Sequence, residues 1–506
     1  DPRTASVTFQ SPAASGAENH LLSAAAVDNG DWVDVRCTAG RTAAATTDWY
    51  RHYGPRNVPP STFTIAGRHS LARKGMSLSF DTVSSQLRFT ADGYPEAIPT
   101  SVALLKWDAL WNTNTSSAAM ADTALDKLPA DAQALRGSSH IGRWELPFIT
   151  GELARALPAI DLEMSALRRR QEPDGGFRLQ QPDGPQDALG LRGDETSGTF
   201  SHSTWMLLRH ARVTGDVRSR DAGLAALDRI RNYQVPRGAS LWEVPIYEPD
   251  MLAAAWNVAA CVEAFRATND TQWLGFGQYW AATSIPFIYC TPDSNRPARL
   301  GSCIPTFGTT FFQHSWIGRP VPWQGLVLAW HLQDLAEQLR GAKRFTPTSD
   351  ALKPQELDVI AKLLVVAAER TWMTSGPNTG LYPDTIENLI TPKPAFIIPE
   401  NLWLHTFRAQ GRELAIQTQR QRGVTISSIA EIAFLNVSED SLITRIEYKP
   451  GTSCGVLLGG IPRRPLAITI DGAPLGSDAW SYDTEKDRVV LKVRFSQKLC
   501  ELRVQY

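Results

Sequence analysis

The chain has 506 residues, a formal net charge of −1 and only 20% charged residues. Binding to phosphate groups needs a basic surface, so this balance argues against nucleic acid and an anionic membrane as partners. The length exceeds what one ordinary hydrophobic core organises, which predicts several domains.

Residues 1–110 are predicted to form an N-terminal antiparallel β-domain. Apolar and polar residues alternate in DWVDVRC, and the apolar runs STFTIAG and MSLSFDTVSSQLRFTADG follow, separated by Gly, Pro and Asn. Residues 111–135 contain few bulky apolar side chains. They are expected to be a linker or an exposed helix that leads to the next domain.

Residues 136–425 are predicted to be mainly helical. The pattern Trp-Glu-Leu/Val-Pro occurs at 144–147 and again at 242–245, each time before an Ala- and Leu-rich segment. Such recurrence indicates helical hairpins repeated around one axis, with Glu145 and Glu243 at the same end. Apolar spacing predicts helices over 148–171, 203–214, 219–232, 251–268, 271–285, 324–340, 355–373 and 401–418.

Residues 426–506 return to an alternating pattern, in the segments LITRIEYKP, LAITIDGAPL, DRVVLKVRFS and ELRVQY. This alternation is typical of strands with one buried face. Asp471 and Gly472 form a dipeptide that favours a tight hairpin turn. We therefore expect a C-terminal antiparallel β-domain.

The helical region also carries turns that read PDGGF at 173–177, VTGD at 213–216 and ATND at 267–270. With β-domains on both sides, it resembles the six-hairpin glycosidase-like superfamily of carbohydrate-active enzymes. The resemblance implies an (α/α)6 toroid over 136–425, with an active site in the loops that precede its inner helices. Terpene cyclases share the toroid and similar turns, but this chain lacks the Asp-rich run that a cyclase needs.

The loops before the predicted helices combine acids, His or Arg with aromatic residues, and the chain is rich in Trp, with sixteen against eleven Tyr. Flat rings beside hydrogen-bonding groups suit the apolar faces of sugars. An oligo- or polysaccharide is therefore the expected substrate. The predicted substrate-binding residues are Arg143, Trp144, Trp242, Trp316, Arg319, Trp323 and Trp403.

The loop 242–250 holds the densest group of acids. Asp250 is predicted to be the N-cap of the following helix. Enclosure by aromatic rings would raise the pKa of Glu243 or Glu248 toward the range of a general acid. Glycoside hydrolysis also needs a second carboxylate across the scissile bond. Its candidates are Asp194, Glu195, Asp384, Glu387 and Glu400, each of which could instead cap a helix.

A polysaccharide lyase is the alternative activity, because the same loops carry His, Tyr and Arg. β-Elimination from a uronate needs a cation at the substrate carboxylate and a group that moves the proton. Arg143, His202, Tyr247, His314 and Arg319 could provide these functions. A noncatalytic sugar-binding protein and an isomerase of a related barrel are further alternatives. A serine hydrolase would need a nucleophile turn of the G-x-S-x-G kind, which is not found.

The six Cys show no metal-ligand spacing, so we expect neither a metal nor a cofactor. Cys290 and Cys303 bracket a polar loop and are expected to form a disulfide, and Cys454 and Cys500 could form a second. The chain starts at Asp1 and has no apolar run of transmembrane length. We therefore expect a secreted or periplasmic protein.

Overall fold

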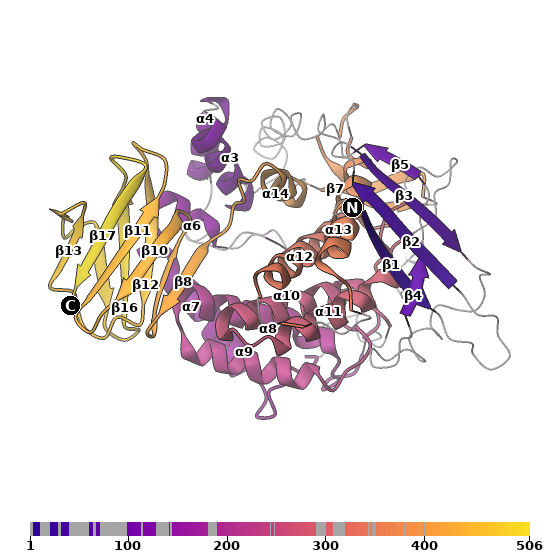
Figure 1. Cartoon of the computed structure of the whole chain (residues 1–506), viewed down its shortest axis with the longest axis horizontal. Coiled ribbons are helices and arrows are strands. Elements are labelled where there is room, and N and C mark those ends of the chain that lie inside the picture. The colour runs from indigo at the N-terminus through magenta and orange to yellow at the C-terminus, as the bar shows by residue number, and fades with distance from the viewer. Residues whose placement is uncertain are drawn as a thin grey trace. The chain divides into compact units, whose positions relative to one another are not determined.

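The computed structural model describes 4–10, 21–28, 32–39, 60–63, 67–70, 99–112, 115–127, 141, 144–180, 190–242, 244–246, 248–289, 300–306, 319–342, 345–346, 351–373, 375–378, 380–387, 389–397 and 400–506. Figure 1 shows its elements. The chain divides into two compact units. Unit 1 comprises Asp1–Ser77, Arg170–Leu208 and Ala222–Leu402. Unit 2 comprises Leu78–Arg169, Arg209–Asp221 and Trp403–Tyr506.

The N-terminal region contains the five-stranded sheet β4-β1-β2-β3-β5. Its strands are β1 (Thr4–Gln10), β2 (Leu21–Asp28), β3 (Trp32–Ala39), β4 (Pro60–Phe63) and β5 (Gly67–Ser70), and neighbouring strands are antiparallel. The predicted strand DWVDVRC falls largely within β3. The segment 76–93, also expected to be β structure, lies outside the described residues.

Two helices follow, where β structure and then a linker or an exposed helix are expected. They are α3 (Pro99–Asn112) and α4 (Thr115–Lys127). The expectation of β structure up to residue 110 is therefore wrong for 99–110. Residues 101–105 are all buried in succession, which differs from the alternation of a strand with one buried face. The domain borders drawn from the sequence stay predictions.

The predicted helical core is confirmed in the described part of 136–425. Its helices are α6 (Glu145–Thr150), α7 (Leu153–Arg169), α8 (Ser197–Thr214), α9 (Val217–Ile230), α10 (Met251–Thr268), α11 (Gln272–Ser284), α12 (Pro322–Gly341), α13 (Pro354–Glu369) and α14 (Glu400–Ala409). The helix expected over 401–418 ends at residue 409. The end of the expected range belongs to strand β8, which begins at Gln417. The short strands β6 (Tyr382–Glu387) and β7 (Thr391–Ile397) form an antiparallel pair that the sequence did not predict.

Within unit 1, α10 packs against α11 and α12, and α12 also packs against α13. Helix α10 is buried on all sides from Met251 to Ala264, as its Ala-rich sequence requires. Helices α8 and α9 approach so closely that a Cβ on Gly223 would lie 2.6 Å from Cγ of Leu208. Antiparallel packing of consecutive helices thus builds the core of this unit.

Unit 2 contains the predicted C-terminal antiparallel structure as two five-stranded sheets. One has the order β10-β11-β17-β13-β14 and the other β15-β16-β12-β9-β8. The strands are β8 (Gln417–Gln421), β9 (Val424–Ser428), β10 (Glu431–Val437), β11 (Ser441–Glu447), β12 (Ser453–Gly459), β13 (Ala467–Ile470), β14 (Ala473–Pro474), β15 (Trp480–Asp483), β16 (Arg488–Arg494) and β17 (Leu499–Gln505). Asp471 and Gly472 both have positive φ and join β13 to β14, which confirms the predicted turn.

The two sheets differ in how far their strands are buried. Strands β11 and β17 alternate between buried and exposed residues, whereas β9 and β12 are buried almost throughout. Helices α6 and α7 pack on β12, and α7 also packs on β16. Both faces of these central strands are therefore removed from water, which accounts for their continuous apolar runs.

A buried ionic network links α7, α8 and β16 within unit 2. Arg488 donates two hydrogen bonds to Asp161, with N–O distances of 3.2 and 2.5 Å. Nε2 of His210 lies 3.1 Å from Asp161 Oδ1, and its Nδ1 lies 2.9 Å from Ser219 Oγ. Two hydrogen bonds from a guanidinium to one carboxylate are among the stronger polar contacts in proteins. His210 thus has a structural role in this network.

The expected disulfides are not formed. Cys303, Cys454 and Cys500 are free, buried thiols, while Cys290 lies outside the described residues. Cys454 is on β12 and Cys500 on β17, which belong to different sheets, and each sulfur has its own hydrogen-bond partner. The Cys303 thiol donates to the Val321 carbonyl at 3.6 Å. The expectation of export loses its disulfide support and stays a prediction.

No helix among the described residues is long and apolar enough to span a membrane.

Candidate functional site

The candidate site of unit 1 begins at strand β6, which is fixed beside the start of α12. The hydroxyl of Thr385 and the backbone N–H of Ile386 both donate to the Pro320 carbonyl, each at 3.1 Å. Pro320 lies two residues before α12, whose first residue is Pro322. These bonds hold β6 and the first turn of α12 side by side.

Asp384 lies at an irregularity in this strand. The register between β6 and β7 shifts between Pro383 and Thr385. Such a bulge re-aims a side chain, and bulges are common beside active sites. The indole N–H of Trp323, in the first turn of α12, donates to Asp384 Oδ1 at 2.9 Å. Burial raises the pKa of Asp384, although the bond from Trp323 opposes that change.

Trp242 adds an exposed aromatic ring to this pair. Its ring centroid is 6.1 Å from that of Trp323, and the two ring planes are tilted by 34°. Trp242 is 44% exposed, whereas Trp323 is 8% exposed. An accessible ring next to a buried acid can stack on the apolar face of a ligand, while nearby polar groups bind the edge of that ligand.

The charges of two carboxylates, Asp384 and Glu400, affect the pKa of Tyr382. Burial raises the pKa of Tyr382, and the negative charges of Glu400 and Asp384 raise it further. Glu400 is the first residue of α14 and is buried. Both carboxylates therefore interact with one phenol, although they come from different elements. The sequence analysis assigned no role to Tyr382; its position two residues before the predicted acid Asp384 in GLYPDTIEN is the signal that could have identified it.

Arg319 is held in an ion pair near the same strand. Its Nη2 lies 3.0 Å from Glu387 Oε1, and Lys393 Nζ lies 2.5 Å from Glu387 Oε2. One carboxylate thus faces two cations. The predicted substrate-binding Arg319 and the candidate acid Glu387 consequently bind each other, with Lys393 as a partner that the sequence did not reveal.

The loop 242–250 is only partly described. Glu243 and Tyr247 lie outside the described residues, as do Arg143, His314 and Trp316. Glu248 is half-buried, and its Oε2 has no hydrogen-bond partner in the part of the chain that the structure describes. The predicted N-cap role of Asp250 is confirmed, because its carboxylate accepts from the N–H groups of Leu252 and Ala253.

Asp194 and Glu195 have structural partners. Asp194 Oδ2 accepts from the Leu191 N–H at 2.8 Å, which closes a turn. Glu195 is paired with Arg229 at 2.9 Å, and Arg178 and Tyr233 also contact it directly. These partners hold the loop before α8 against the PDGGF turn, where Arg178 also pairs with Asp174. Both acids thus have structural partners, and a catalytic role for either stays a prediction.

His202 belongs to an aromatic cluster on α8, α10 and α12. Its ring centroid is 4.6 Å from that of Trp256 and 5.5 Å from that of Trp205. His331 packs on the other side of the cluster, 5.3 Å from Trp256. His202 is half-buried, while the other three residues are buried. The structure thus places His202 within a cluster of packed aromatic rings.

Trp144 and Trp403, which are predicted to bind sugar, both have buried side chains in this structure. Trp144 packs edge-on against His210, and the guanidinium of Arg209 lies 5.9 Å from its ring centroid. Glu145, expected in a loop, is the buried first residue of α6 and pairs with Arg209. The two Trp-Glu-x-Pro sequences therefore differ in environment, since Trp242 is exposed.

Among the described residues, no group of three or more His, Cys, Asp or Glu side chains is arranged to hold a metal ion.

No protein-family model and no curated protein matches the sequence. Solved structures with a similar fold include the unsaturated glucuronyl hydrolase from Bacillus sp. GL1, with 13% identity over 67% of this chain and 96% of that chain and a TM-score of 0.45. Another is the unsaturated glucuronyl hydrolase from Streptococcus agalactiae, with 11% identity, coverage of 67% and 92% and a TM-score of 0.41.

A β-L-arabinofuranosidase from Geobacillus stearothermophilus matches at 10% identity over 86% of this chain and 79% of that chain, with a TM-score of 0.30. At such low identities and TM-scores, the likeness assigns no chemistry to any residue of this chain.

Proposed function

We propose that this chain is a glycoside hydrolase in which Asp384 donates the proton to the leaving glycosidic oxygen. The observation that carries the proposal is the environment of Asp384. Burial raises its pKa, and the Trp323 indole fixes one of its oxygens at 2.9 Å. A general acid must be protonated near the working pH and held in one orientation, and this environment favours both.

Glu400 is the proposed second carboxylate, acting as base or nucleophile. It is buried and interacts with the same phenol as Asp384. Hydrolysis of a glycosidic bond requires two carboxyl groups on either side of the reacting carbon, and acids on two separate elements can meet that requirement. Glu248, whose Oε2 has no partner among the described residues, is the other candidate for this role.

The proposed ligand is an oligo- or polysaccharide whose sugar ring stacks on Trp242. The exposed indole lies beside Trp323, which also holds the proposed acid. A sugar on Trp242 would therefore lie near Asp384. We further propose that the helices between 136 and 425 belong to an (α/α)6 toroid.

The lyase alternative receives no specific support from the described residues. Arg319 already faces Glu387, and Tyr382 is buried with a raised pKa. A buried phenol that resists ionisation is a poor base for abstracting a sugar proton. A panel of neutral and uronate-containing polysaccharides separates the two activities. New reducing ends without absorbance of an unsaturated product support hydrolysis, and both signals together support elimination.

The proton-donor role is tested with Asp384→Asn on two substrates of the sugar that the panel identifies. One is the natural saccharide, whose leaving group needs a proton, and the other is a 2,4-dinitrophenyl glycoside, whose leaving group does not. We expect turnover of the natural saccharide to fall by about 10²–10⁴-fold, with a much smaller loss on the activated substrate.

Asp194→Asn is the matched control, since that acid closes a turn, and it should retain turnover on both substrates. Thermal melting checks that each variant is folded. An equal loss on both substrates, or near-normal turnover of Asp384→Asn, would remove Asp384 from the role of proton donor.

A further inference from the structure

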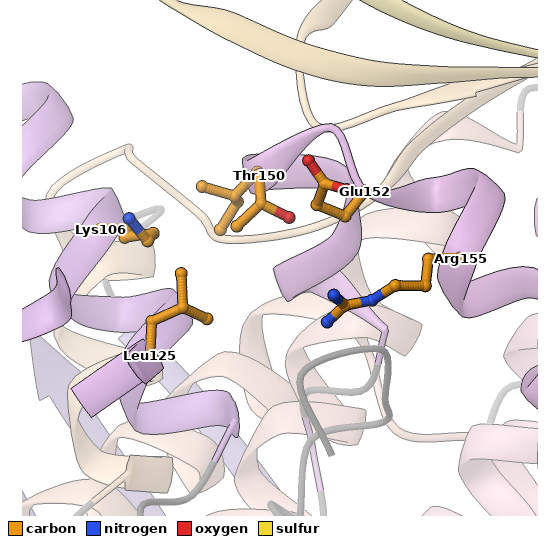
Figure 2. A pocket seen from close by; sticks show the side chains of 6 residues that line it. Lys106, Leu125, Thr150, Glu152 and Arg155 are labelled. Atoms are coloured by element: carbon orange, nitrogen blue, oxygen red, sulfur yellow. The ribbon is translucent and has the colours of Figure 1, made fainter. Parts of the chain in front are cut away.

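Unit 2 contains a pocket of about 580 Å³, and Figure 2 shows Lys106 and Glu152 in its wall. Both of these charged side chains have partners on the protein. Lys106 pairs with Asp122 at 2.9 Å. Glu152 pairs with Lys492 at 3.0 Å. The charged cluster that bears on the candidate active site lies instead in unit 1, on the strand that carries Asp384.

This cluster, the Glu387 triad, consists of Glu387, Arg319 and Lys393. Arg319 Nη2 lies 3.0 Å from Glu387 Oε1, and Lys393 Nζ lies 2.5 Å from Glu387 Oε2. Glu387 is the last residue of β6, Lys393 is on β7, and Arg319 comes shortly before α12. One carboxylate, through its two oxygens, thus joins both strands of the hairpin to the segment that leads into α12.

The Glu387 triad lies where the hairpin is attached to the start of α12. The Thr385 hydroxyl and the Ile386 N–H both donate to the Pro320 carbonyl at 3.1 Å, and Pro320 directly follows Arg319. Three consecutive residues of β6, 385–387, are therefore bound to two consecutive residues before α12.

Asp384 comes immediately before these attached residues, at the register shift between Pro383 and Thr385. A bulge leaves a residue without a regular partner on the neighbouring strand, so pairing with β7 contributes little to the orientation of Asp384. That orientation depends on the residues that follow Asp384 and on its bond from the Trp323 indole at 2.9 Å. A displacement of 385–387 would therefore move the carboxylate away from that indole.

Removing the charge of Glu387 would set two cations against each other. The Arg319 guanidinium and the Lys393 ammonium would face each other across a neutral side chain, and like charges repel. The side chains of Arg319, Glu387 and Lys393 are 18%, 30% and 41% exposed, so water weakens these interactions. The expected consequence is a displaced strand end rather than an unfolded protein.

We propose that Glu387 is a positioning residue, which holds β6 against the start of α12 and thereby holds Asp384 against the Trp323 indole. Its carboxylate acts by keeping Arg319 and Lys393 in place and transfers no proton itself. The kinetic consequence rests on the proposed function, in which Asp384 is the proton donor. The structural consequence is independent of that function.

The structural part is tested by hydrogen exchange of the full chain without substrate. In Glu387→Gln, the backbone amides of β6, including that of Ile386, should exchange about fivefold faster than in wild type. The Trp323 indole proton should also exchange faster, as measured by NMR with ¹⁵N-labelled Trp and assigned by its absence from Trp323→Phe. Adding Lys393→Gln should restore part of the protection, because it removes one of the two opposing cations.

Asp358→Asn is the matched control. Asp358 pairs with Arg340 between α13 and α12 of the same unit, and its side chain is 30% exposed, as is that of Glu387. This variant should leave β6 and the Trp323 indole at wild-type exchange rates. Thermal melting confirms that each variant is folded.

The kinetic part compares the natural saccharide with the 2,4-dinitrophenyl glycoside. A misplaced proton donor slows only the reaction whose leaving group needs a proton. Glu387→Gln should therefore lower kcat about tenfold on the natural saccharide and much less on the activated substrate. A general loss of structure would instead lower kcat on both substrates.

The proposal is overturned if β6 and the Trp323 indole exchange at wild-type rates in Glu387→Gln, or if Asp358→Asn changes them equally. It is also overturned if Asp384→Asn shows the difference between the two substrates while Glu387→Gln shows none. If Asp384→Asn itself lacks that difference, the proton-donor role fails, and the exchange rates alone decide the positioning role of Glu387.

Discussion

The buried network around Asp161 provides a quantitative test of how α7 and the C-terminal sheet stabilise unit 2. Asp161→Asn keeps the size of the side chain but removes its charge. Arg488 then loses the carboxylate that accepts its two hydrogen bonds, and His210 loses its anionic neighbour at 3.1 Å. Asp483 lies 3.3 Å from Arg488 and offers only partial compensation from a more exposed position.

The expected loss follows from the burial of both partners. Asp161 and Arg488 are buried, so water cannot replace the lost contacts. Removing one partner of a buried ion pair typically costs about 3–5 kcal/mol, because the other charge stays buried. In a unit of this size, 1 kcal/mol corresponds to roughly 2–4 °C in Tm. We therefore expect the Tm of Asp161→Asn to fall by roughly 6–20 °C.

The pH dependence follows from the direction of the pKa shift. Hydrogen bonds from His210 and Arg488 outweigh burial and hold the pKa of Asp161 well below its usual range. The unfolded chain therefore binds this proton at higher pH than the folded chain does. The stabilisation is fully present above about pH 5 and diminishes as the pH falls below about 4. The wild-type advantage over Asp161→Asn should shrink in the same range.

Calorimetric melting of wild type and Asp161→Asn between pH 3 and pH 8 measures both effects. Glu447→Gln is the control, because Glu447 pairs with the exposed Lys498 at 3.1 Å and its loss should cost less than about 1 kcal/mol. If Asp161→Asn melts within the range of this control, or if the difference persists unchanged at pH 3, the network does not stabilise unit 2 as argued.

Three further predictions concern the candidate site, a helix cap and the thiols. Trp323→Phe removes the hydrogen bond that lowers the pKa of Asp384. The alkaline limb of the pH profile of kcat/KM should therefore move to higher pH. A shift to lower pH would contradict the proton-donor role. Asp250→Ala removes bonds to Leu252 and Ala253, so Tm should fall by an amount equivalent to at least ~1 kcal/mol, whereas an unchanged melting curve would show that the cap contributes nothing. Burial raises the pKa of Cys454 to about 12, so its thiol should react with a disulfide reagent only after unfolding; mass mapping that finds a Cys454–Cys500 disulfide in native protein would refute the free-thiol assignment.

Local patterns in the sequence determined most of the secondary structure. Helix α10 occupies the predicted range 251–268, and Asp250 caps it as expected. The turn at Asp471 and Gly472 also agrees, because both residues tolerate positive φ. These features depend on contacts within a few residues, which the order of side chains along the chain specifies directly. The acids and rings of the candidate site were likewise visible as residue types beside predicted helices.

Tertiary structure alone decided which of those residues meet. Nothing in the sequence favours Asp384 over Glu195. In the fold, the bonds of β6 to Pro320 place Asp384 against Trp323, while Glu195 forms an ion pair with Arg229. Periodicity identifies the face of a helix or strand that is buried, but not the element that covers it. Asp161 and Arg488 are far apart in the sequence, and they meet only when α7 packs on β16. Their pairing matters there because a buried charge is costly unless it has a partner.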